Sequence, residues 1–437
     1  MQNTNKKLFE ETPVPQAVQT MMIPTIIGAL VTVLHSLVVG MMNDQIQNAA
    51  VALAAPALLA FNAVINLFGI GSSSMMSRAL GRGDLKTVCA SASLGFYGTV
   101  VSGALLSALC YIFMQPFVVL LGGDINTAAA TTAYMNWAVV CGAIPTILNV
   151  VMGYMVRAEG ASLHASIGTM SGCILNMILD PFFILPWGLG MGAAGAGLAT
   201  FLSNCFACCY FFVLLMVRKK KTNINLNPKY LSLTKEIVFG VMEVGIPAAI
   251  QNLLNVTGMT ILNNFVAGYG SSAVAAVGIA QKVYMVPIQV ALGGTQGVMP
   301  LVGYSYASKN KQRFEETIQT VMKLLVPCMV LIMILCWIFA PSLIRLFMKN
   351  EEVITYGAMF LRGFCMCMPF MLIDFLAVSV FESVGMGKTA LVFAILRKIV
   401  FEIPAIVILN KIFQTSGITY AGFVSEFILS IIAVILL

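Results

Sequence analysis

A carboxylate and an amide, four residues apart inside a long apolar stretch, are the residues of this sequence best suited to ion chemistry. Asn176 and Asp180 are one helical turn apart, so in a helix their side chains project from the same face. No other charged residue occurs between positions 161 and 217. A carboxylate at bilayer depth costs roughly 2.5–3.5 kcal/mol on insertion scales, and such residues mark ion sites or pathways by default. We therefore predict that Asp180 belongs to a cation site.

Pro181 follows this carboxylate directly and interrupts the helical hydrogen bonding around it. A proline has no backbone donor and leaves a carbonyl free, which a membrane helix tolerates only where another group satisfies that carbonyl. A purely structural interpretation makes Asp180 a cap at a proline kink and Asn176 a link between helices. We favour the functional interpretation because an intramembrane carboxylate is costly.

The composition places these residues in a membrane protein. The chain has 437 residues, of which 59% are hydrophobic and 9% charged, with a mean hydropathy of +0.93. Soluble globular proteins carry about 25% charged residues. The 11 cysteines show no paired spacing, and His35 and His164 are the only histidines, so neither disulfides nor a metal cluster is predicted. We expect an all-α polytopic membrane protein without a cofactor.

Apolar windows of about 20 residues, the length needed to cross a bilayer, divide the chain into about twelve transmembrane helices. The predicted spans are 16–40, 50–77, 91–115, 126–156, 162–186, 192–217, 240–267, 273–303, 314–340, 351–384, 388–411 and 416–437. They separate an N-terminal segment (1–15), an N-lobe (16–217), a basic linker (218–239) and a C-lobe (240–437). The first apolar segment is too long for a signal peptide. The last span has no polar tail, so truncation at the C-terminus is one interpretation.

Basic residues gather in alternate loops, and this pattern predicts the orientation. They are concentrated in the N-terminal segment, in the loop around Arg78 and Arg82, and in the linker from Arg218 to Lys235. By the positive-inside rule these segments lie in the cytoplasm. The formal charge of +7 therefore reflects membrane topology rather than nucleic-acid binding.

Three pairs of short motifs recur at nearly the same separation, about 225 residues, and indicate an internal duplication. The pairs are Pro24 with Pro247, 77–81 with 303–307, and 192–197 with 417–422. Six helices return a chain to its starting side of the membrane, so the two halves share one orientation. We predict two parallel six-helix repeats with alternating access at their interface.

The motifs along these spans resemble the multidrug and toxic compound extrusion (MATE) transporters, in particular their DinF-like bacterial branch. The resemblance covers nearly the whole chain, and the order and spacing of the motifs are more specific than any one of them. They are Ile23-Pro24, Ser77-Arg78-Ala79-Leu80-Gly81-Arg82-Gly83-Asp84, Val156-Arg157-Ala158-Glu159-Gly160, Leu175-Asn176 with Leu179-Asp180-Pro181, Gly197-Leu198-Ala199-Thr200 and Gly245-Ile246-Pro247.

This resemblance implies a secondary active antiporter, folded as a V-shaped bundle of two lobes. It would export amphipathic, often cationic drugs or metabolites in exchange for H⁺ or Na⁺. We expect a monomer in the bacterial plasma membrane, with its N-terminus in the cytoplasm and lipophilic cations as small-molecule substrates. The 28 methionines and 27 phenylalanines would suit a site that accepts many shapes.

The resemblance also implies a cation site in the N-lobe, made by Asn176, Asp180 and Thr200. The family's fourth member of this site is an aspartate on the first helix, and this chain has His35 at that position. A hard Na⁺ ion prefers oxygen ligands, whereas imidazole is a softer nitrogen donor. Our hypothesis is that His35 and Asp180 exchange a proton as a coupled pair. Na⁺ at Asp180, or a histidine that merely links two helices, are the alternatives.

Substrate contacts are expected in the C-lobe, where this chain resembles the family less. The candidates are Asp374, Asn255, Gln251 and Phe375. An acid flanked by aromatic rings suits a lipophilic cation, although Asp374 could instead pair with Arg362 or Arg397.

Three prolines inside predicted helices are candidate hinges: Pro24, Pro181 and Pro247. Glu402 lies four residues after Lys398, which predicts an ion pair within one helix. Glu382 is expected near the cytoplasmic end, where it would reach water. For Lys282 the sequence favours neither a snorkelling role nor the neutralisation of an acid.

Competing functions are less well supported by the residues. A flippase for lipid-linked precursors from the same superfamily would hold a pyrophosphate with several basic residues, yet few lie inside the spans. A transporter redirected to one metabolite is a further alternative. No H-E-x-x-H, G-x-S-x-G or phosphate-loop motif indicates an enzyme. The twofold duplication suits alternating access better than a channel.

Overall fold

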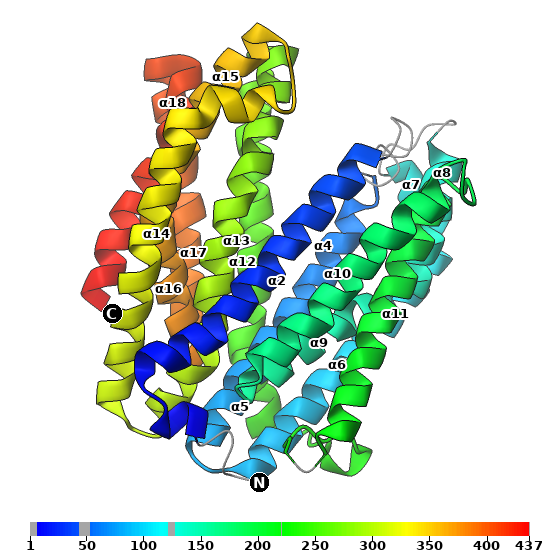
Figure 1. Ribbon diagram of the computed structural model, residues 1–437, viewed down its shortest axis with the longest axis vertical. Helices are drawn as coiled ribbons and strands as arrows, with labels where there is room; N and C mark the ends of the chain where they lie inside the picture. The colour runs from blue at the N-terminus through cyan, green and yellow to red at the C-terminus, as the bar shows by residue number, and fades with distance from the viewer. Residues whose placement is uncertain (1–6, 43–52, 121–126, 220, 437) are drawn as a thin grey trace.

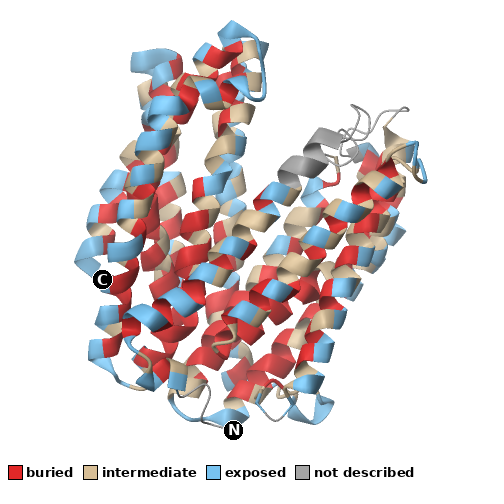
Figure 2. Cartoon of the chain, viewed as in Figure 1, coloured by how far each residue is buried: buried red, intermediate tan, exposed pale blue. Residues whose placement is uncertain are grey.

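The computed structural model describes residues 7–42, 53–120, 127–219 and 221–436. Two bundles of helices stand side by side and diverge toward one end, so that the molecule has the shape of a V (Figure 1). Buried residues are concentrated where the bundles meet, near the narrow end of the V (Figure 2). The narrow end is therefore closed by packing.

The N-lobe and the C-lobe follow one another along the chain. The N-lobe consists of α2 (Val14–Met42), α4 (Ala55–Ile65), η2 (Asn66–Ile70), α5 (Gly71–Gly81), α6 (Leu85–Ile112), α7 (Met114–Leu120), α8 (Ala128–Met135), η3 (Asn136–Cys141), α9 (Ala143–Ala158), α10 (Ser162–Ile184) and α11 (Ala193–Val217). The C-lobe consists of α12 (Lys235–Ala267), α13 (Ser271–Ala307), α14 (Lys311–Arg345), α15 (Glu351–Met366), α16 (Met368–Val384), α17 (Gly387–Ile395), η5 (Leu396–Glu402) and α18 (Ile403–Leu436).

Eight helices in the described part of the chain are long and apolar enough to cross a membrane, and two further pairs pass the same test as bent spans. The bent pairs meet at 49° where η3 joins α9 and at 46° where α15 joins α16. Within α18 the chain turns sharply at Gln414, whose φ is 52°. Beyond it, the Ser425 hydroxyl donates to the Arg397 carbonyl at 2.8 Å. With the two arms of α18, the spans amount to about the predicted twelve.

Several helices begin earlier than the sequence predicted, because their first turns carry charges. α6 begins at Leu85 rather than at residue 91, and α12 begins at Lys235 rather than at residue 240. A helix can continue beyond the hydrocarbon core of the bilayer through a charged first turn. A search for apolar residues finds only the part of the helix inside that core. The windows therefore located the spans but not the helix ends.

Matching turns after α5 and after α13 support the duplication. Gly83 and Lys309 both have positive φ, 74° and 60°. The next residue in each turn, Asp84 or Asn310, caps the following helix by accepting a hydrogen bond from the backbone N–H three residues later, at 3.1 Å and 3.0 Å. A polar cap of this kind satisfies a helical donor that has no partner within the helix. The same local solution thus occurs once in each lobe.

Replacing Asp84 with alanine is expected to lower the stability of the protein by about 1 kcal/mol at pH 7, the usual cost of losing such a cap. Hydrogen bonds from the Thr87 hydroxyl and N–H hold the pKa of the Asp84 carboxyl below its ordinary value of 3.8. A lowered pKa stabilises the folded state above that ordinary value, and the stabilisation is lost as the pH falls through the folded-state pKa. Thermal unfolding in detergent at pH 7 and pH 3 measures the difference.

The matched control is Asp84→Asn, because asparagine caps helices well but does not titrate. This variant should match the wild type at pH 7 and should show no acid-dependent loss from this site. An alanine variant as stable as the wild type at pH 7 would contradict the capping role.

α2 belongs to the N-lobe by sequence, yet its first half packs into the core of the C-lobe. Val18, Met21 and Met22 share an apolar cluster with residues of α13 and α14. The approach to α13 is close: a Cβ at Gly297 would lie 3.0 Å from the Met21 carbonyl oxygen. The second half of α2 crosses to α10 of the N-lobe (Figure 1). α2 therefore packs against both lobes.

The N-terminal segment packs across the narrow end of the V. In η1 (Lys7–Glu11), Phe9 is fully buried and stacks on Tyr304 of α13 with ring centroids 4.7 Å apart. Arg313 of α14 donates to the backbone carbonyls of Leu8 and Thr12, at 3.0 Å and 2.7 Å. The segment thus closes this end against the C-lobe.

Candidate cation and cargo sites

His35, Asn176 and Asp180 form a chain of contacts between α2 and α10. His35 Nε2 contacts the side-chain oxygen of Asn176, and the Asn176 amide donates to Asp180 Oδ1 at 3.3 Å. The helical spacing predicted that Asn176 and Asp180 share a face, and the structure brings them together. In this arrangement Nε2 is the donor of the first contact, because the amide oxygen can only accept.

Asp180 is buried, with 1% of its surface exposed. Its second oxygen, Oδ2, has no hydrogen-bond partner among the described residues. His35 does not reach the carboxyl directly, because Asn176 lies between them. The predicted pair is therefore a relay of three side chains, with one carboxylate oxygen left free.

Thr200 is not brought into hydrogen-bonding contact with Asp180. Its hydroxyl donates to the Ala196 carbonyl of its own helix at 2.9 Å. The residue that sequence reasoning missed is Tyr134 of α8, which is buried and lies within electrostatic range of Asp180. A tyrosine inside an apolar span carries little signal in the sequence, because its position relative to α10 depends on how the helices pack.

The oxygens near Asp180 differ in their contacts. Asp180 has one oxygen without a hydrogen-bond partner among the described residues, the Asn176 oxygen contacts His35, and the Thr200 hydroxyl donates within its own helix. A hard cation needs several oxygen ligands around it, whereas a proton needs one acceptor.

A cavity of about 360 Å³ lies in the C-lobe and reaches the N-lobe at Asn66 and Ile70. Gln251, Asn255 and Phe375, which were predicted to contact substrate, all line it. Methionine and aromatic side chains provide much of its apolar wall, among them Met259, Met371, Phe364 and Tyr284.

Asp374, the fourth predicted substrate residue, lies behind the cavity wall. It is fully buried, and its carboxyl lies close to that of Glu426 on α18. Neither oxygen of Asp374 has a hydrogen-bond partner among the described residues, and two carboxylates this close repel each other unless one holds a proton. Sequence reasoning missed Glu426, since the turn predicted between residues 411 and 416 does not by itself show which side chains of the last span face α16.

Arg397, rather than Arg362, lies beside this acid pair. It donates to the Asn255 side-chain oxygen at 2.7 Å, and its guanidinium lies 5.2 Å from the centre of the Phe375 ring. Arg362 instead stacks on Trp337 at 5.1 Å. The positive charge of Arg397 is therefore held by the cavity wall.

Two glutamates have clear partners in the structure. Lys398 Nζ lies 2.5 Å from Glu402, which is the ion pair that the sequence predicted. Glu382 does not reach water as expected; it is 5% exposed and accepts a hydrogen bond from Gln251 at 3.2 Å. The packing of α5 against this end of α16 covers it, since the Ser74 hydroxyl donates to the Glu382 carbonyl at 2.5 Å. Position along one helix could not reveal that neighbour.

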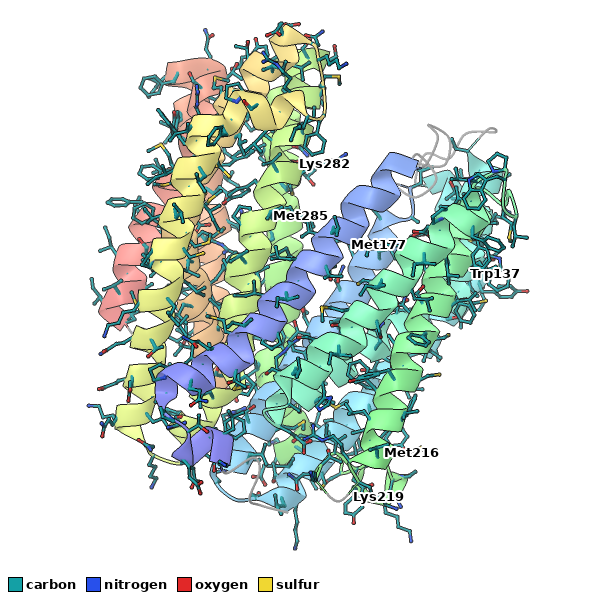
Figure 3. All side chains as sticks on the ribbon, viewed as in Figure 1. Trp137, Met177, Met216, Lys219, Lys282 and Met285 are labelled. Atoms are coloured by element: carbon teal, nitrogen blue, oxygen red, sulfur yellow. The ribbon has the colours of Figure 1, made fainter. Side chains whose placement is uncertain are left out.

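Pro24, Pro181 and Pro247 all lie inside continuous helices, so the structure leaves their hinge role a prediction. Lys282 is exposed, and with Met285 it lies on the side of α13 that faces the N-lobe (Figure 3). Met177 lies on α10, one residue after Asn176 (Figure 3).

The chain is similar to known transport proteins. The MatE family model matches residues 21–182 and again residues 247–408. The second match begins in the seventh span, as the duplication predicts. The multidrug export protein MepA of Staphylococcus saprophyticus is 28% identical over 433 residues, which cover 98% of this chain and 94% of that protein.

Solved structures share the fold. A structure described as the outward-facing conformation of a multidrug resistance MATE family transporter of the MOP superfamily matches with a TM-score of 0.93 and 22% identity. The match covers 99% of this chain and 97% of that one. A crystal structure of MATE in complex with MaL6 gives the same TM-score, identity and coverage. The arrangement of about twelve helices in two parallel repeats is thereby confirmed.

Proposed function

Because this chain belongs to the MATE family of membrane transporters, which are not enzymes, we propose that it exports amphipathic cations in exchange for protons. The coupling site is the relay of His35, Asn176 and Asp180, and the cargo site is the cavity of the C-lobe. The relation to proteins named for multidrug export supports the direction and breadth of transport. We expect a monomer in a bacterial plasma membrane.

One observation carries this proposal: Asp180 is buried between helices and keeps one oxygen free. A buried carboxylate without a positive partner is unfavourable and gains a proton or a cation when one can reach it. His35 stands where the family's aspartate is expected, so a nitrogen donor replaces a carboxylate oxygen that a hard metal ion would prefer. This exchange favours H⁺ as the coupling ion.

The two lobes communicate through α2. Its first half packs into the C-lobe core, Pro24 lies within it, and its second half carries His35 to the relay. Protonation of Asp180 changes the charge that the second half of α2 faces. The first half of α2 moves with the C-lobe, because it is packed into the core of that lobe. Coupling requires only that the proton favours one arrangement of the lobes and the cargo favours the other.

The direction of opening follows from the charges at the narrow end. The N-terminal segment, the basic loop that follows α5 and the linker with Lys219 gather there (Figures 1 and 3). By the positive-inside rule this end faces the cytoplasm, so the wide end of the V opens to the exterior. A proton from outside then neutralises Asp180 and releases the cargo, and the inward-facing state returns the proton to the cytoplasm.

The cavity favours a cation over an anionic lipid-linked precursor. Arg397 and Lys398 are the basic residues among those that line it, and each already has partners, Asn255 with Phe375 and Glu402. A pyrophosphate would have to displace them. The acids Glu382 and Glu426 also line the cavity.

Efflux of ethidium from proteoliposomes, with a proton gradient and a Na⁺ gradient imposed separately, tests this function. We expect a proton gradient alone to drive efflux and a Na⁺ gradient alone to leave the rate at the background of protein-free vesicles. The His35→Asp variant adds an oxygen donor and should acquire Na⁺-driven efflux. Strict dependence on Na⁺ in the wild type would contradict the proposal.

A further inference from the structure

Among the described residues, Glu382 has no positively charged partner, although it lines the cargo cavity. Glu402 and Glu426 also line the cavity: Glu402 is paired with Lys398 at 2.5 Å, and Glu426 lies beside a second acid, Asp374. Glu382 receives a single hydrogen bond, from the neutral amide of Gln251. Among the described residues no arginine, lysine or histidine forms an ion pair with it.

We propose that Glu382 provides the counter-charge that holds the cationic group of the cargo at the floor of the cavity. The proposal rests on the export function proposed above and names the residue that recognises the charge. It assigns this role to an acid that the sequence placed near water, and it removes the role from Asp374, which does not line the cavity.

The floor of the cavity is built from both lobes. Asn66 and Ile70 come from the N-lobe, whereas Gln251, Gln296 and Glu382 come from the C-lobe. Across the boundary, the Tyr154 hydroxyl of α9 donates to Gln296 at 3.2 Å, and the Ser74 hydroxyl of α5 donates to the backbone of Glu382 at 2.5 Å. A cationic group of the cargo that binds to Glu382 therefore lies at the boundary between the two lobes.

Burial makes this carboxylate an effective partner for a cation. An isolated charge away from water is costly, and a ligand of opposite charge offsets that cost while losing its own hydration. A lipophilic cation, whose charge is shielded by apolar groups, loses little hydration when it binds. Neutral walls above the floor, including Ile288, Leu292, Met371 and Phe375, suit the apolar body of such a molecule.

The preferred cargo is then a molecule with one positive group at one end and an apolar body of moderate size. The body lies along the wall formed by α13 and α16, and the charge reaches Glu382. A dianion finds no free positive charge at this floor, and an uncharged molecule uses only the walls. Charge selectivity should therefore depend on Glu382, and apolar binding should not.

Binding of tetraphenylphosphonium to the purified protein in detergent tests the proposal. We expect Glu382→Gln to raise the dissociation constant at least about tenfold, a change of about 1.4 kcal/mol. Glutamine keeps the shape of the side chain and can still accept from Gln251, so folding is preserved. Glu382→Asp keeps the charge and should stay within about threefold of the wild type, a difference of about 0.7 kcal/mol.

Two controls separate charge from shape. Glu243→Gln removes a negative charge from α12 at a residue that does not line the cavity. It should leave the dissociation constant for tetraphenylphosphonium unchanged. The uncharged dye N-phenyl-1-naphthylamine should bind wild type and Glu382→Gln equally.

Unchanged tetraphenylphosphonium binding in Glu382→Gln would overturn the proposal but leave proton-coupled export intact. An equal loss of binding for tetraphenylphosphonium and for the uncharged dye would have the same consequence. No binding of tetraphenylphosphonium by the wild type would overturn both this proposal and the cationic cargo of the proposed function.

Discussion

Replacing Asp180 with asparagine should abolish export without unfolding the protein. Asparagine keeps the shape of the side chain and can still accept from Asn176, but it can neither bind nor release a proton. Its permanently neutral form holds the lobes in the arrangement that the proton favours, so the exchange cycle cannot be completed. We expect the export rate to fall to the background of cells that lack the protein, because no transport cycle is completed.

Resistance of cells to ethidium, with the amount of membrane-inserted protein measured in parallel, reports this loss. Tetraphenylphosphonium should still bind to the purified variant, because Asp180 does not line the cargo cavity. Its affinity should be lower than in the wild type, because the neutral side chain favours the arrangement of the lobes that the cargo disfavours. Asp84→Asn, at the helix cap outside both sites, is the matched control and should export normally. Resistance retained by Asp180→Asn at normal protein levels would argue strongly against the relay as the coupling site.

Replacing Gly245 with alanine should disrupt the closure of the narrow end. A Cβ at Gly245 of α12 would lie 2.0 Å from the carbonyl oxygen of Leu67 in η2. Such a contact cannot be relieved by rotating a side chain, because the oxygen belongs to the backbone of the other lobe. The lobes must separate here, and overpacking of this kind typically costs about 1–3 kcal/mol. A cost of that size shifts the population from the closed to the open narrow end by about 5-fold to 140-fold.

The reactivity of a cysteine introduced at a buried position of the narrow end measures this opening. Ser77 is 2% exposed on α5, at the interface near Gly303. In a background without the native cysteines, Ser77→Cys should resist maleimide, and the addition of Gly245→Ala should make it reactive. Gly278→Ala is the control, because nothing lies within 4 Å of the position of its Cβ. Protection unchanged by Gly245→Ala, with normal export, would contradict the role of this contact.

Much of the fold was predictable because its determinants are local or periodic. Apolar windows located the spans, and the recurrence of motifs predicted the two repeats that the family model also matches. The first helix was assigned wholly to the N-lobe, although Met21 and Met22 pack into the C-lobe core. That assignment followed the order of the chain, whereas the packing of α2 depends on the small residues that α13 presents to it, Gly293 and Gly297.

The relay was predictable for the same reason. Asn176 and Asp180 are neighbours on one helix, and periodicity alone brings them together. Their partners come from other helices: His35 was found through a resemblance, and Tyr134 was not found. The sequence of contacts along the relay places Asn176 between His35 and Asp180. It results from how the helices pack, and the spacing of the residues does not reveal it.

The C-lobe shows where helical position becomes misleading. Asp374 and Glu382 lie eight residues apart on α16, and eight residues rotate a helix by about 80° beyond two full turns. Asp374 therefore faces Glu426 of α18, whereas Glu382 faces Gln251 of α12 and the cavity. The flanking aromatic residues made Asp374 attractive as a cargo contact. Only the arrangement of the neighbouring helices decides which acid the cavity exposes.

Proton release on cargo binding shows whether Asp180 couples the cargo cavity to the proton. Tetraphenylphosphonium is added to purified protein in weakly buffered detergent solution, and the released protons are counted with a pH indicator, with and without Na⁺. If Asp180 alternates between proton and cargo through the lobes, the wild type releases protons, Na⁺ does not change the amount, and Asp180→Asn releases fewer by about one per molecule. Equal release by the wild type and Asp180→Asn, or release that Na⁺ abolishes, would contradict the account.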